Sequence, residues 1–317
     1  NTPSNRIFFQ SNEPSPYERH VFHISDEGGA STRVTTLPGQ HRPYPSPDGM
    51  RVALLHNSDI SPTELYLMDT RSGLPESQIT MSFNPEFISK SWVQPRYATF
   101  KSQIDDYTLH ARILEPAKLK RGRQYPVIFG PAYSNTVRNR WAGNTSLLQQ
   151  LLVERGYIVI QVDVRGSTGY GREFREEFLM DFAGNDIEDL ESAVNYLSTL
   201  PYVDPKRIGI WGSSYGGTLT IYSLFKKPGL FKAGVAGAAA VDPYFFGTDD
   251  VAIVRRPETH PEAFSRGALQ YADNLEDHLL IIHGMQDHVV PFKTVAVLAE
   301  ELIRLEKDFD FVFVPGA

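Results

Sequence analysis

The sequence predicts an α/β fold for most of the chain, preceded by a smaller region of short antiparallel strands. From about residue 92 onward, apolar runs typical of buried strands alternate with segments whose apolar residues recur every three or four positions, as in helices. Such alternation favours a mostly parallel sheet covered on both faces. Before residue 92, short alternating strands are separated by turn residues. We therefore expect two domains, residues 1–91 and 92–317.

The first region contains an internal repeat. Its predicted strands are residues 6–11, 19–24, 51–56 and 65–68. The first and third begin at residues 6 and 51, an offset of 45, and each is followed by a second strand and then by a turn, Gly28-Gly29 or Ser72-Gly73. Short strands at this period are typical of β-propeller blades, although an ordinary β-meander is the alternative. Because two blades cannot close a propeller, we expect residues 1–91 to be the last blades of an incomplete one.

The second region is predicted to contain eight strands and four clear helices. The strands are residues 97–102, 109–114, 126–129, 158–164, 208–211, 233–239, 279–283 and 309–314. The helices are residues 146–155, 186–197, 215–225 and 293–305. This order of crossovers matches the α/β-hydrolase plan, an eight-stranded mostly parallel sheet with helices on both faces, whose catalytic groups lie on loops at the carboxyl ends of strands.

Composition weighs against several classes of function. Lys and Arg number 31 against 38 Asp and Glu, so a net charge of -7 offers no basic surface for nucleic acid. The absence of cysteine removes disulfides, thiolate nucleophiles and Cys-ligated metal sites. No apolar run approaches the ~20 residues of a membrane span. No cofactor is implied, because the glycines after Arg165 lack the spacing of a dinucleotide-binding motif, and no metal site is predicted.

A nucleophile elbow is predicted around Ser214. The motif Gly212-x-Ser214-x-Gly216 directly follows a buried strand and directly precedes a helix. The turn in such an elbow is so sharp that the residues two before and two after the nucleophile must be nearly free of side chains. The neighbouring Ser213 does not fit, because Trp211 lies two residues before it. A glycine-rich packing turn is the alternative.

An acid is predicted at Asp287, four residues past the end of the strand at 279–283 and in the loop that opens the next helix. A carboxylate in this loop can accept a hydrogen bond from the far nitrogen of a histidine, fixing its tautomer and stabilising the imidazolium formed when serine loses its proton. A helix cap is the alternative role for a loop aspartate.

The sequence offers no convincing base. In this fold the histidine follows the last strand, and no histidine lies beyond His288. His283 is expected to be buried at the strand end, and the side chain of His288 to turn away from Asp287. We therefore expect the chain to be a piece of a longer polypeptide whose catalytic histidine follows Ala317. The 317 residues alone should then be inactive or nearly so.

Four stretches resemble the prolyl oligopeptidase family of serine peptidases, especially its dipeptidyl-peptidase and acylaminoacyl-peptidase-like branches. They are Gly130-Pro131, Val162-Asp-Val-Arg-Gly-Ser-Thr-Gly-Tyr-Gly171, Tyr202-Val-Asp-Pro-Lys-Arg-Ile-Gly-Ile-Trp-Gly-Ser-Ser-Tyr-Gly-Gly217 and His283-Gly-Met-Gln-Asp-His-Val-Val-Pro291. The resemblance implies that Ser214 attacks the scissile carbonyl, that Asp287 orients the base, and that the base is a histidine shortly after Ala317. Arg165, beside Asp163, is expected to fix a loop through an ion pair.

The same resemblance implies an oxyanion hole formed by the backbone amide of Tyr215 and a tyrosine hydroxyl. The family's tyrosine usually sits just before the Gly-Pro pair, where this chain has Ile128-Phe129. Tyr133 is therefore the candidate donor, with a packing tyrosine as the alternative. Relatives build an apolar substrate pocket after the nucleophile helix, and core packing explains the corresponding aromatic run here equally well. The pocket candidates are Tyr244, Phe245 and Phe246.

We expect a serine peptidase, of dipeptidyl- or oligopeptidase type, that hydrolyses short peptides through an acyl-enzyme. The expected partner is a peptide substrate and not nucleic acid, and a homodimer is left open. A carboxylesterase on the same fold is one alternative. A catalytically silent binding scaffold is another, if the polypeptide truly ends at Ala317. The sequence does not determine the location; a periplasmic or secreted protein is favoured, with a cytoplasmic one as the alternative.

Overall fold

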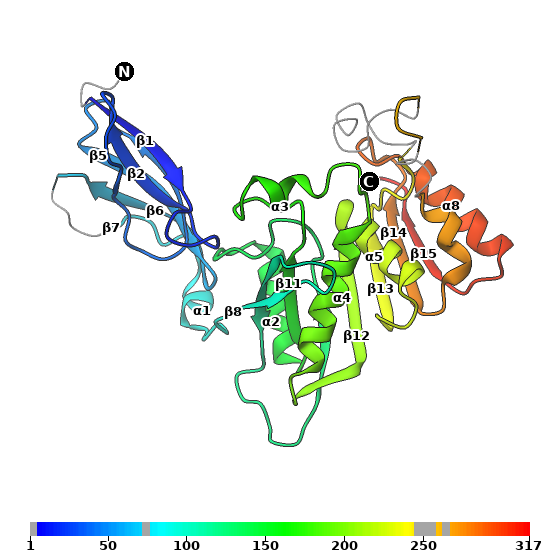
Figure 1. Cartoon of the computed structure of the whole chain (residues 1–317). Coiled ribbons are helices and arrows are strands. Elements are labelled where there is room, and N and C mark those ends of the chain that lie inside the picture. Colours follow the sequence, from blue (N-terminus) through cyan, green and yellow to red (C-terminus); the bar gives the residue numbers. More distant parts are fainter. Residues whose placement is uncertain (1–4, 72–76, 244–257, 262–266) are drawn as a thin grey trace. The chain divides into compact units, whose positions relative to one another are not determined.

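A computed structural model describes residues 5–71, 77–243, 258–261 and 267–317, and it divides into two compact units (Figure 1). Unit 1 comprises Asn1–Pro95 and Arg138–Gln150, and unit 2 comprises Arg96–Val137 and Leu151–Ala317. Nothing in the sequence pattern indicates that a stretch of chain beyond residue 137 folds with the first unit. The division into domains at residues 91 and 92 stays a prediction.

Unit 1 is built from two antiparallel sheets, one in the order β1-β2-β3 and one in the order β4-β5-β6-β7. Its strands are β1 (Arg6–Ser11), β2 (His20–Ser25), β3 (Thr32–Arg33), β4 (Gln40–Pro45), β5 (Arg51–Ser58), β6 (Ser61–Asp69) and β7 (Ser77–Gln78). The 45-residue repeat relates the β1-β2 hairpin to the β5-β6 hairpin. The sequence pattern misses β3 and β7 because they have two residues each, and β4 because it contains Pro43 and Pro45.

An aromatic cluster holds the stretch Arg138–Gln150 within unit 1. The short helix α1 (Pro85–Ser89) is capped by Asn84, whose side chain accepts a hydrogen bond from the Phe87 backbone N–H at 2.7 Å. The Phe87 ring lies 5.3 Å from that of Trp141 and contacts it edge to face. The Gln150 side chain also bonds both backbone groups of Val93. These contacts explain why the stretch packs with the first unit.

Unit 2 contains an eight-stranded sheet in the order β15-β14-β13-β12-β10-β11-β9-β8. Its strands are β8 (Arg96–Lys101), β9 (Thr108–Leu114), β10 (Tyr125–Phe129), β11 (Ile158–Asp163), β12 (Val203–Ser213), β13 (Ala233–Gly237), β14 (His278–Gly284) and β15 (Asp310–Val314). The six strands from β10 to β15 are parallel, whereas β9 pairs antiparallel with β8 and β11. The eight strands predicted from the sequence, and their mostly parallel arrangement, are confirmed.

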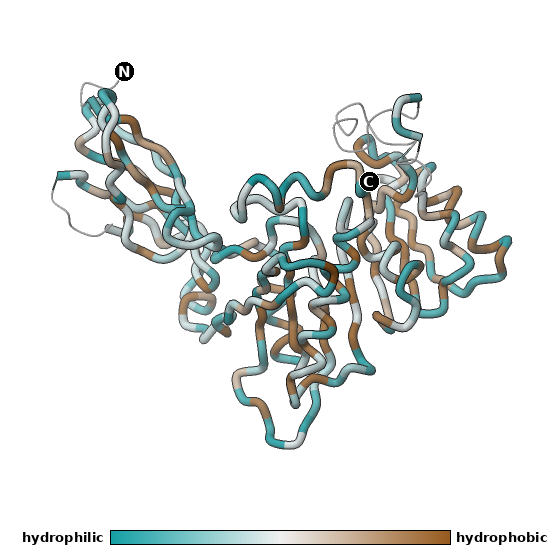
Figure 2. The backbone as a smooth tube through the Cα atoms, in the orientation of Figure 1, coloured by the Kyte–Doolittle hydropathy of each residue, from teal (hydrophilic) through white to brown (hydrophobic). Residues whose placement is uncertain are grey.

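Helices alternate with these strands along the chain, at the places where the sequence predicts them. They are α2 (Asn144–Glu154), α4 (Asn185–Ser198), α5 (Tyr215–Lys226) and α8 (Lys293–Arg304), joined by the shorter α3 (Arg172–Glu176) and the 3-10 helix η3 (Ala268–Asn274). All six residues of β11 are buried, as expected of a strand covered on both faces. Figure 2 shows hydrophobic segments along the strands of the sheet and hydrophilic segments along the outer loops. In the described part of the chain, no helix has the length and apolar character needed to cross a membrane.

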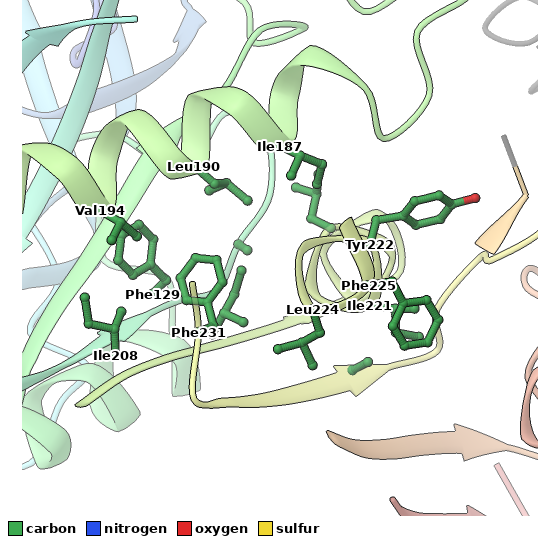
Figure 3. Close-up of a cluster of buried hydrophobic side chains, with 14 of the residues drawn as sticks. Phe129, Ile187, Leu190, Val194, Ile208, Ile221, Tyr222, Leu224, Phe225 and Phe231 are labelled. Atoms are coloured by element: carbon green, nitrogen blue, oxygen red, sulfur yellow. The ribbon is translucent and has the colours of Figure 1, made fainter. Parts of the chain in front are cut away.

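The core of unit 2 fixes the helix on which the candidate nucleophile lies. Ile187, Leu190 and Val194 recur at helical spacing on α4 and point into this core (Figure 3). Every residue of α5 from 216 to 225 is buried, and its labelled side chains in Figure 3 point outward on several sides of the helix. A helix buried almost all round is held by packing on every side, so its first turn has little freedom to move.

Candidate active site

The predicted elbow is present as a backbone turn at Ser214. Strand β12 ends at Ser213, helix α5 begins at Tyr215, and Ser214 between them has φ 57° and ψ -126°. This region is costly for a residue with a side chain, and it persists only where the surroundings impose it. Here the Ser214 N–H donates to the carbonyl of Gly237 at 2.9 Å, and its own carbonyl accepts from the Thr218 N–H at 3.1 Å.

The glycines around Ser214 are required by close backbone contacts. A Cβ atom on Gly212 would lie 2.5 Å from the carbonyl group of Gly216. A Cβ atom on Gly216 would lie 2.0 Å from the carbonyl oxygen of Ala132, and one on Gly217 would lie 2.4 Å from that of Gly237. The chain therefore has no room for side chains at these positions, which is the physical reason for the motif.

The two neighbouring serines differ in position. Ser213 is the last residue of β12 and is exposed, whereas the half-buried Ser214 lies at the strained junction. Within the described residues, no hydrogen bond joins the Ser214 hydroxyl to a histidine. The structure thus supplies the geometry of a nucleophile without showing its base.

The loop after β10 passes directly against the elbow. The Ala132 N–H donates to the carbonyl of Trp211 at 2.8 Å, and the Ala132 carbonyl lies where a side chain at Gly216 would be. The next residue, Tyr133, is 38% exposed, and its ring stands edge-on to the ring of Tyr215 with centroids 6.2 Å apart. The side chains of the two residues that carry the candidate oxyanion donors, Tyr215 and Tyr133, are therefore in contact.

The side chain of Tyr215 contacts a buried carboxylate, that of Asp186, which the sequence motifs do not reveal. The Tyr215 hydroxyl donates to Asp186 Oδ2 and accepts a hydrogen bond from the Ala183 N–H at 3.3 Å. Burial raises the pKa of Asp186 to about 7, although the hydrogen bond from Tyr215 acts in the opposite direction. Burial and the neighbouring Asp186 also raise the pKa of Tyr215 well above its ordinary value. In sequence, Asp186 looks like an ordinary acidic residue in the first turn of a helix.

Asp287 lies in the loop after β14, and backbone N–H groups of that loop hold its carboxylate. Its Oδ1 accepts hydrogen bonds from the backbone N–H groups of Val289 and Val290, at 2.8 and 2.9 Å. Its Oδ2 lies 3.7 Å from His283 Nε2, which is beyond hydrogen-bond distance. The carboxylate, whose side chain is 21% exposed, therefore keeps one oxygen for another donor.

The histidines nearest to Asp287 have other roles in the structure. His283 is buried, and its Nε2 donates to the Val290 carbonyl at 2.8 Å, as expected for a structural histidine. His288 is exposed. The contact of His283 with the Val290 carbonyl is not the histidine bridge between acid and serine that a triad requires.

The topology places Ser214 and Asp287 at the same edge of the sheet. Ser214 follows β12 and Asp287 follows β14, with only β13 between these parallel strands. Adjacent strands lie about 4.8 Å apart, so the two strand ends are roughly 10 Å apart. A histidine can span this interval between an acid and a serine hydroxyl.

Arg165 forms the expected ion pair, but with partners other than its neighbour Asp163. Its guanidinium is buried and bonds Asp189 at 2.8 Å and Asp105 at 3.0 Å. Burial alone would lower the pKa of Arg165, and these two carboxylates raise it above its ordinary value instead. Asp163 instead accepts the Tyr170 hydroxyl at 2.8 Å, in addition to two backbone N–H groups. Both side chains fix the loop after β11.

Tyr244, Phe245 and Phe246 lie outside the described residues, so the substrate pocket stays a prediction. Across the described ranges, no group of three or more His, Asp or Glu side chains is placed to hold a metal ion.

Comparisons with known proteins give one consistent family. The family model described as the prolyl oligopeptidase family, Peptidase_S9, matches residues 144–317. Over 98% of its length the chain is 26% identical to human dipeptidyl peptidase 8 and 28% identical to a probable dipeptidyl-aminopeptidase B of Aspergillus oryzae, and it spans 36% of each. It is also 28% identical to the uncharacterized peptidase YuxL of Bacillus subtilis, over 86% of this chain and 42% of that protein.

A solved structure shows the same similarity in three dimensions. Dipeptidyl peptidase 4 of Porphyromonas gingivalis superposes with a TM-score of 0.89 at 27% sequence identity, covering 98% of this chain and 45% of that one. The chain thus spans less than half the length of each of these similar proteins.

Proposed function

Because the chain belongs to the prolyl oligopeptidase family, we propose that it carries the nucleophile and acid of a serine peptidase that hydrolyses short peptides. Membership of this family, together with the mostly parallel eight-stranded sheet, gives unit 2 the α/β-hydrolase fold. The similar proteins are named dipeptidyl peptidases and dipeptidyl-aminopeptidase, so we propose that the reaction is of dipeptidyl- or oligopeptidase type.

The elbow geometry at Ser214 carries this proposal. The Ser214 hydroxyl attacks the carbonyl carbon of the scissile peptide bond, and a histidine takes the hydroxyl proton. The resulting oxyanion is stabilised by the Tyr215 N–H, at the start of the 12-residue helix α5, and by the Tyr133 hydroxyl. The histidine gives the hydroxyl proton to the leaving nitrogen as the C–N bond breaks, and water then hydrolyses the resulting acyl-enzyme. The strained backbone at Ser214 supports this role, because such strain clusters at functional sites.

Asp287 orients the base in this proposal, and the base is a histidine that follows Ala317 in the complete polypeptide. Two backbone contacts support this placement. The Met285 N–H donates to the carbonyl of Val314 at 3.0 Å, and the Gln286 N–H donates to that of Ala317 at 2.6 Å. The chain at Ala317 therefore lies beside the loop that carries Asp287. A residue a few positions further on could reach the free Oδ2 of that carboxylate.

We also propose that unit 1 is the last part of a β-propeller. Its two antiparallel sheets and the correspondence of the β1-β2 and β5-β6 hairpins support this assignment. The sheet β4-β5-β6-β7 has the four strands of a blade, and β5 is its second strand. Because the repeat pairs β1 with β5, β1 would be the second strand of the preceding blade. The aromatic pocket at Tyr244, Phe245 and Phe246, and a homodimer, stay predictions.

Hydrolysis of a dipeptidyl 4-nitroanilide by the full-length polypeptide tests the proposal. Ser214→Ala should lower kcat/KM by roughly 10⁶-fold, because the nucleophile is lost. The matched control is Ser213→Ala, which removes the adjacent hydroxyl and should keep the wild-type rate. Hydrolysis that survives Ser214→Ala, or that is lost equally in Ser213→Ala, would refute the assignment of Ser214.

A further inference from the structure

The buried carboxylate of Asp186, which bonds the side chain of Tyr215, has no part in the chemistry described so far. Asp186 lies in the first turn of α4, is 1% exposed, and bonds the hydroxyl of Tyr215 through Oδ2. Its Oδ1 is also buried and has no hydrogen-bond partner among the described residues. A buried carboxylate is costly unless its contacts compensate for lost hydration. The hydrogen bond from the Tyr215 hydroxyl is therefore the contact through which Asp186 acts on its surroundings.

The neighbouring Asp189 provides a comparison on the same helix. Both carboxylates are buried on α4, three residues apart, and burial raises the pKa of each. Asp189 is paired with the guanidinium of Arg165 at 2.8 Å, which is an ordinary structural ion pair. Asp186 instead directs its oxygen at a neutral hydroxyl, whose residue supplies the backbone amide next to the nucleophile.

The Tyr215 side chain is enclosed by aromatic rings from two other segments. Its ring centroid lies 5.1 Å from that of Phe178 and 5.4 Å from that of Phe182, in the segment before α4. The third neighbour is the Tyr133 ring, edge-on at 6.2 Å. The contacts with Phe178 and Tyr133 are edge-to-face and that with Phe182 is tilted, so the ring is packed by these neighbours while its hydroxyl is hydrogen-bonded. Tyr215 thereby contacts the other candidate donor of the oxyanion hole.

The segment that precedes Asp186 is itself locked around the Tyr215 hydroxyl. Ala183 is buried in a left-handed conformation, with φ 49°. Both of its backbone groups are used, because its N–H donates to the Tyr215 hydroxyl and its carbonyl accepts from Lys226 Nζ at 2.6 Å. A non-glycine residue keeps such a conformation only where its surroundings impose it. The hydroxyl therefore sits between a fixed donor and a fixed acceptor.

We propose that Asp186 is a positioning residue for the oxyanion hole. Through the Tyr215 hydroxyl it fixes the Tyr215 backbone amide, and through the Tyr215 ring it fixes the ring of Tyr133, whose hydroxyl is the second donor. This inference rests on the proposed function and adds to it the device that holds the hole in place. Displacement of a reacting group by 1 Å costs on the order of 10²-fold in rate, and loss of an oxyanion donor costs roughly 10²- to 10³-fold.

Four variants of the full-length polypeptide test the proposal with a dipeptidyl 4-nitroanilide. Asp186→Ala and Tyr215→Phe should each lower kcat by roughly 10- to 100-fold with little change in KM, because the hole acts on the transition state. The double variant should be no slower than either single variant, since both break one contact. Asp186→Asn should restore most of the rate, because its amide oxygen can still accept the hydroxyl hydrogen bond.

Two controls separate positioning from stability. Asp189→Asn removes the other buried charge of α4 and should lower the midpoint of urea unfolding while leaving kcat per folded molecule near wild type. Affinity for a peptide boronic acid, whose serine adduct is tetrahedral, should fall in parallel with kcat in Asp186→Ala and Tyr215→Phe. If Asp186→Ala does not fold, Tyr215→Phe carries the test, because it keeps the ring and removes one oxygen.

A folded Asp186→Ala or Tyr215→Phe with wild-type kcat would overturn the inference. A loss of kcat equal to that in Asp189→Asn, or an increase in KM alone, would also overturn it. A wild-type polypeptide with no more hydrolysis than Ser214→Ala would instead overturn the proposed function, and the inference with it.

Discussion

The elbow and the acid loop, the two sides of the candidate site, are held in place in different ways. Ser214 is fixed by buried backbone contacts, glycines that admit no side chain, and a helix buried from residue 216 to 225. Asp287 is fixed by two N–H groups of its own loop, whose neighbouring side chains Met285 and Val289 are exposed. The elbow is therefore held by the buried core, whereas the acid loop is held by hydrogen bonds within itself and to the backbone of Val314 and Ala317.

This difference predicts how each side responds to substitution. A side chain added at one of the elbow glycines disturbs the packed interior and should cost both stability and activity. A change in the acid loop should affect chemistry while the fold survives. The following predictions test this contrast, from the largest expected effect to the smallest.

The largest effect is expected from removing the charge of Asp287. In Asp287→Asn the amide oxygen can still accept the Val289 and Val290 N–H groups, so the loop should keep its shape. The lost charge can no longer stabilise the imidazolium, and kcat/KM should fall by roughly 10⁴-fold, or about 5.5 kcal/mol. Kinetics with a dipeptidyl nitroanilide measure this fall, and urea unfolding should show an unchanged midpoint. Unfolding of the variant would show that the loop contributes to the core.

The next effect is expected at Gly216. A Cβ atom there would meet the Ala132 carbonyl oxygen at 2.0 Å, so Gly216→Ala should lower the free energy of unfolding by about 5 kcal/mol. Gly209→Ala is the matched control on β12, because its Cβ atom would make ordinary contacts at 3.4 Å. Urea unfolding of both variants measures the difference. Equal stability of the two would contradict the account of the elbow.

The contrast between elbow and acid loop also explains what the sequence could predict. Residues such as Gly212 and Gly216 are sterically obligatory, so the local pattern alone places Ser214 at the turn. The central strands are equally visible, because runs such as β11 are apolar and fully buried, and the exposed edge strand β15 is still a run of apolar residues after its first position. Elements with weak or short patterns, such as β3 and β7, are not visible.

The Asp186 contact and the place of residues 138–150 in unit 1 could not be predicted. Asp186 and Tyr215 are 29 residues apart, and the acid has the same local context as any first-turn carboxylate. The stretch 138–150 is placed by contacts such as that between Trp141 and Phe87, which are distant in sequence. Such tertiary contacts leave no periodic signal in one sequence.

A pH-dependent effect is expected from Asp186. Its pKa of about 7 lies above its ordinary value, so the folded state binds the proton more tightly than the unfolded chain. The stabilisation is complete below about pH 4 and is lost as the pH rises through 7, by up to about 4 kcal/mol. Nearby charges contribute, because Asp181 and Asp189 raise this pKa and Lys226 lowers it.

Urea unfolding of the wild type and Asp186→Asn across pH 4 to 8 measures this dependence. The slope should be much smaller in the variant. Asp204→Asn, in which a surface acid paired with Arg207 loses its charge, should keep the wild-type slope. An unchanged slope in Asp186→Asn would mean that the carboxylate is already ionised at pH 4.

The smallest effect is expected at Val289. Its side chain is 84% exposed, and only its backbone N–H holds Asp287. Val289→Ser should therefore change the free energy of unfolding by less than about 0.5 kcal/mol. Urea unfolding provides the measurement. A loss comparable to that in Gly216→Ala would remove the contrast between the two sides of the site.

The most direct test of the central claim is to identify the serine that reacts with a fluorophosphonate probe. The full-length polypeptide is treated with the probe, and tandem mass spectrometry locates the modified residue. The account predicts a single modification on Ser214, retained in Ser213→Ala and absent in Ser214→Ala. Modification of Ser213, or equal labelling of Ser214→Ala, would contradict it.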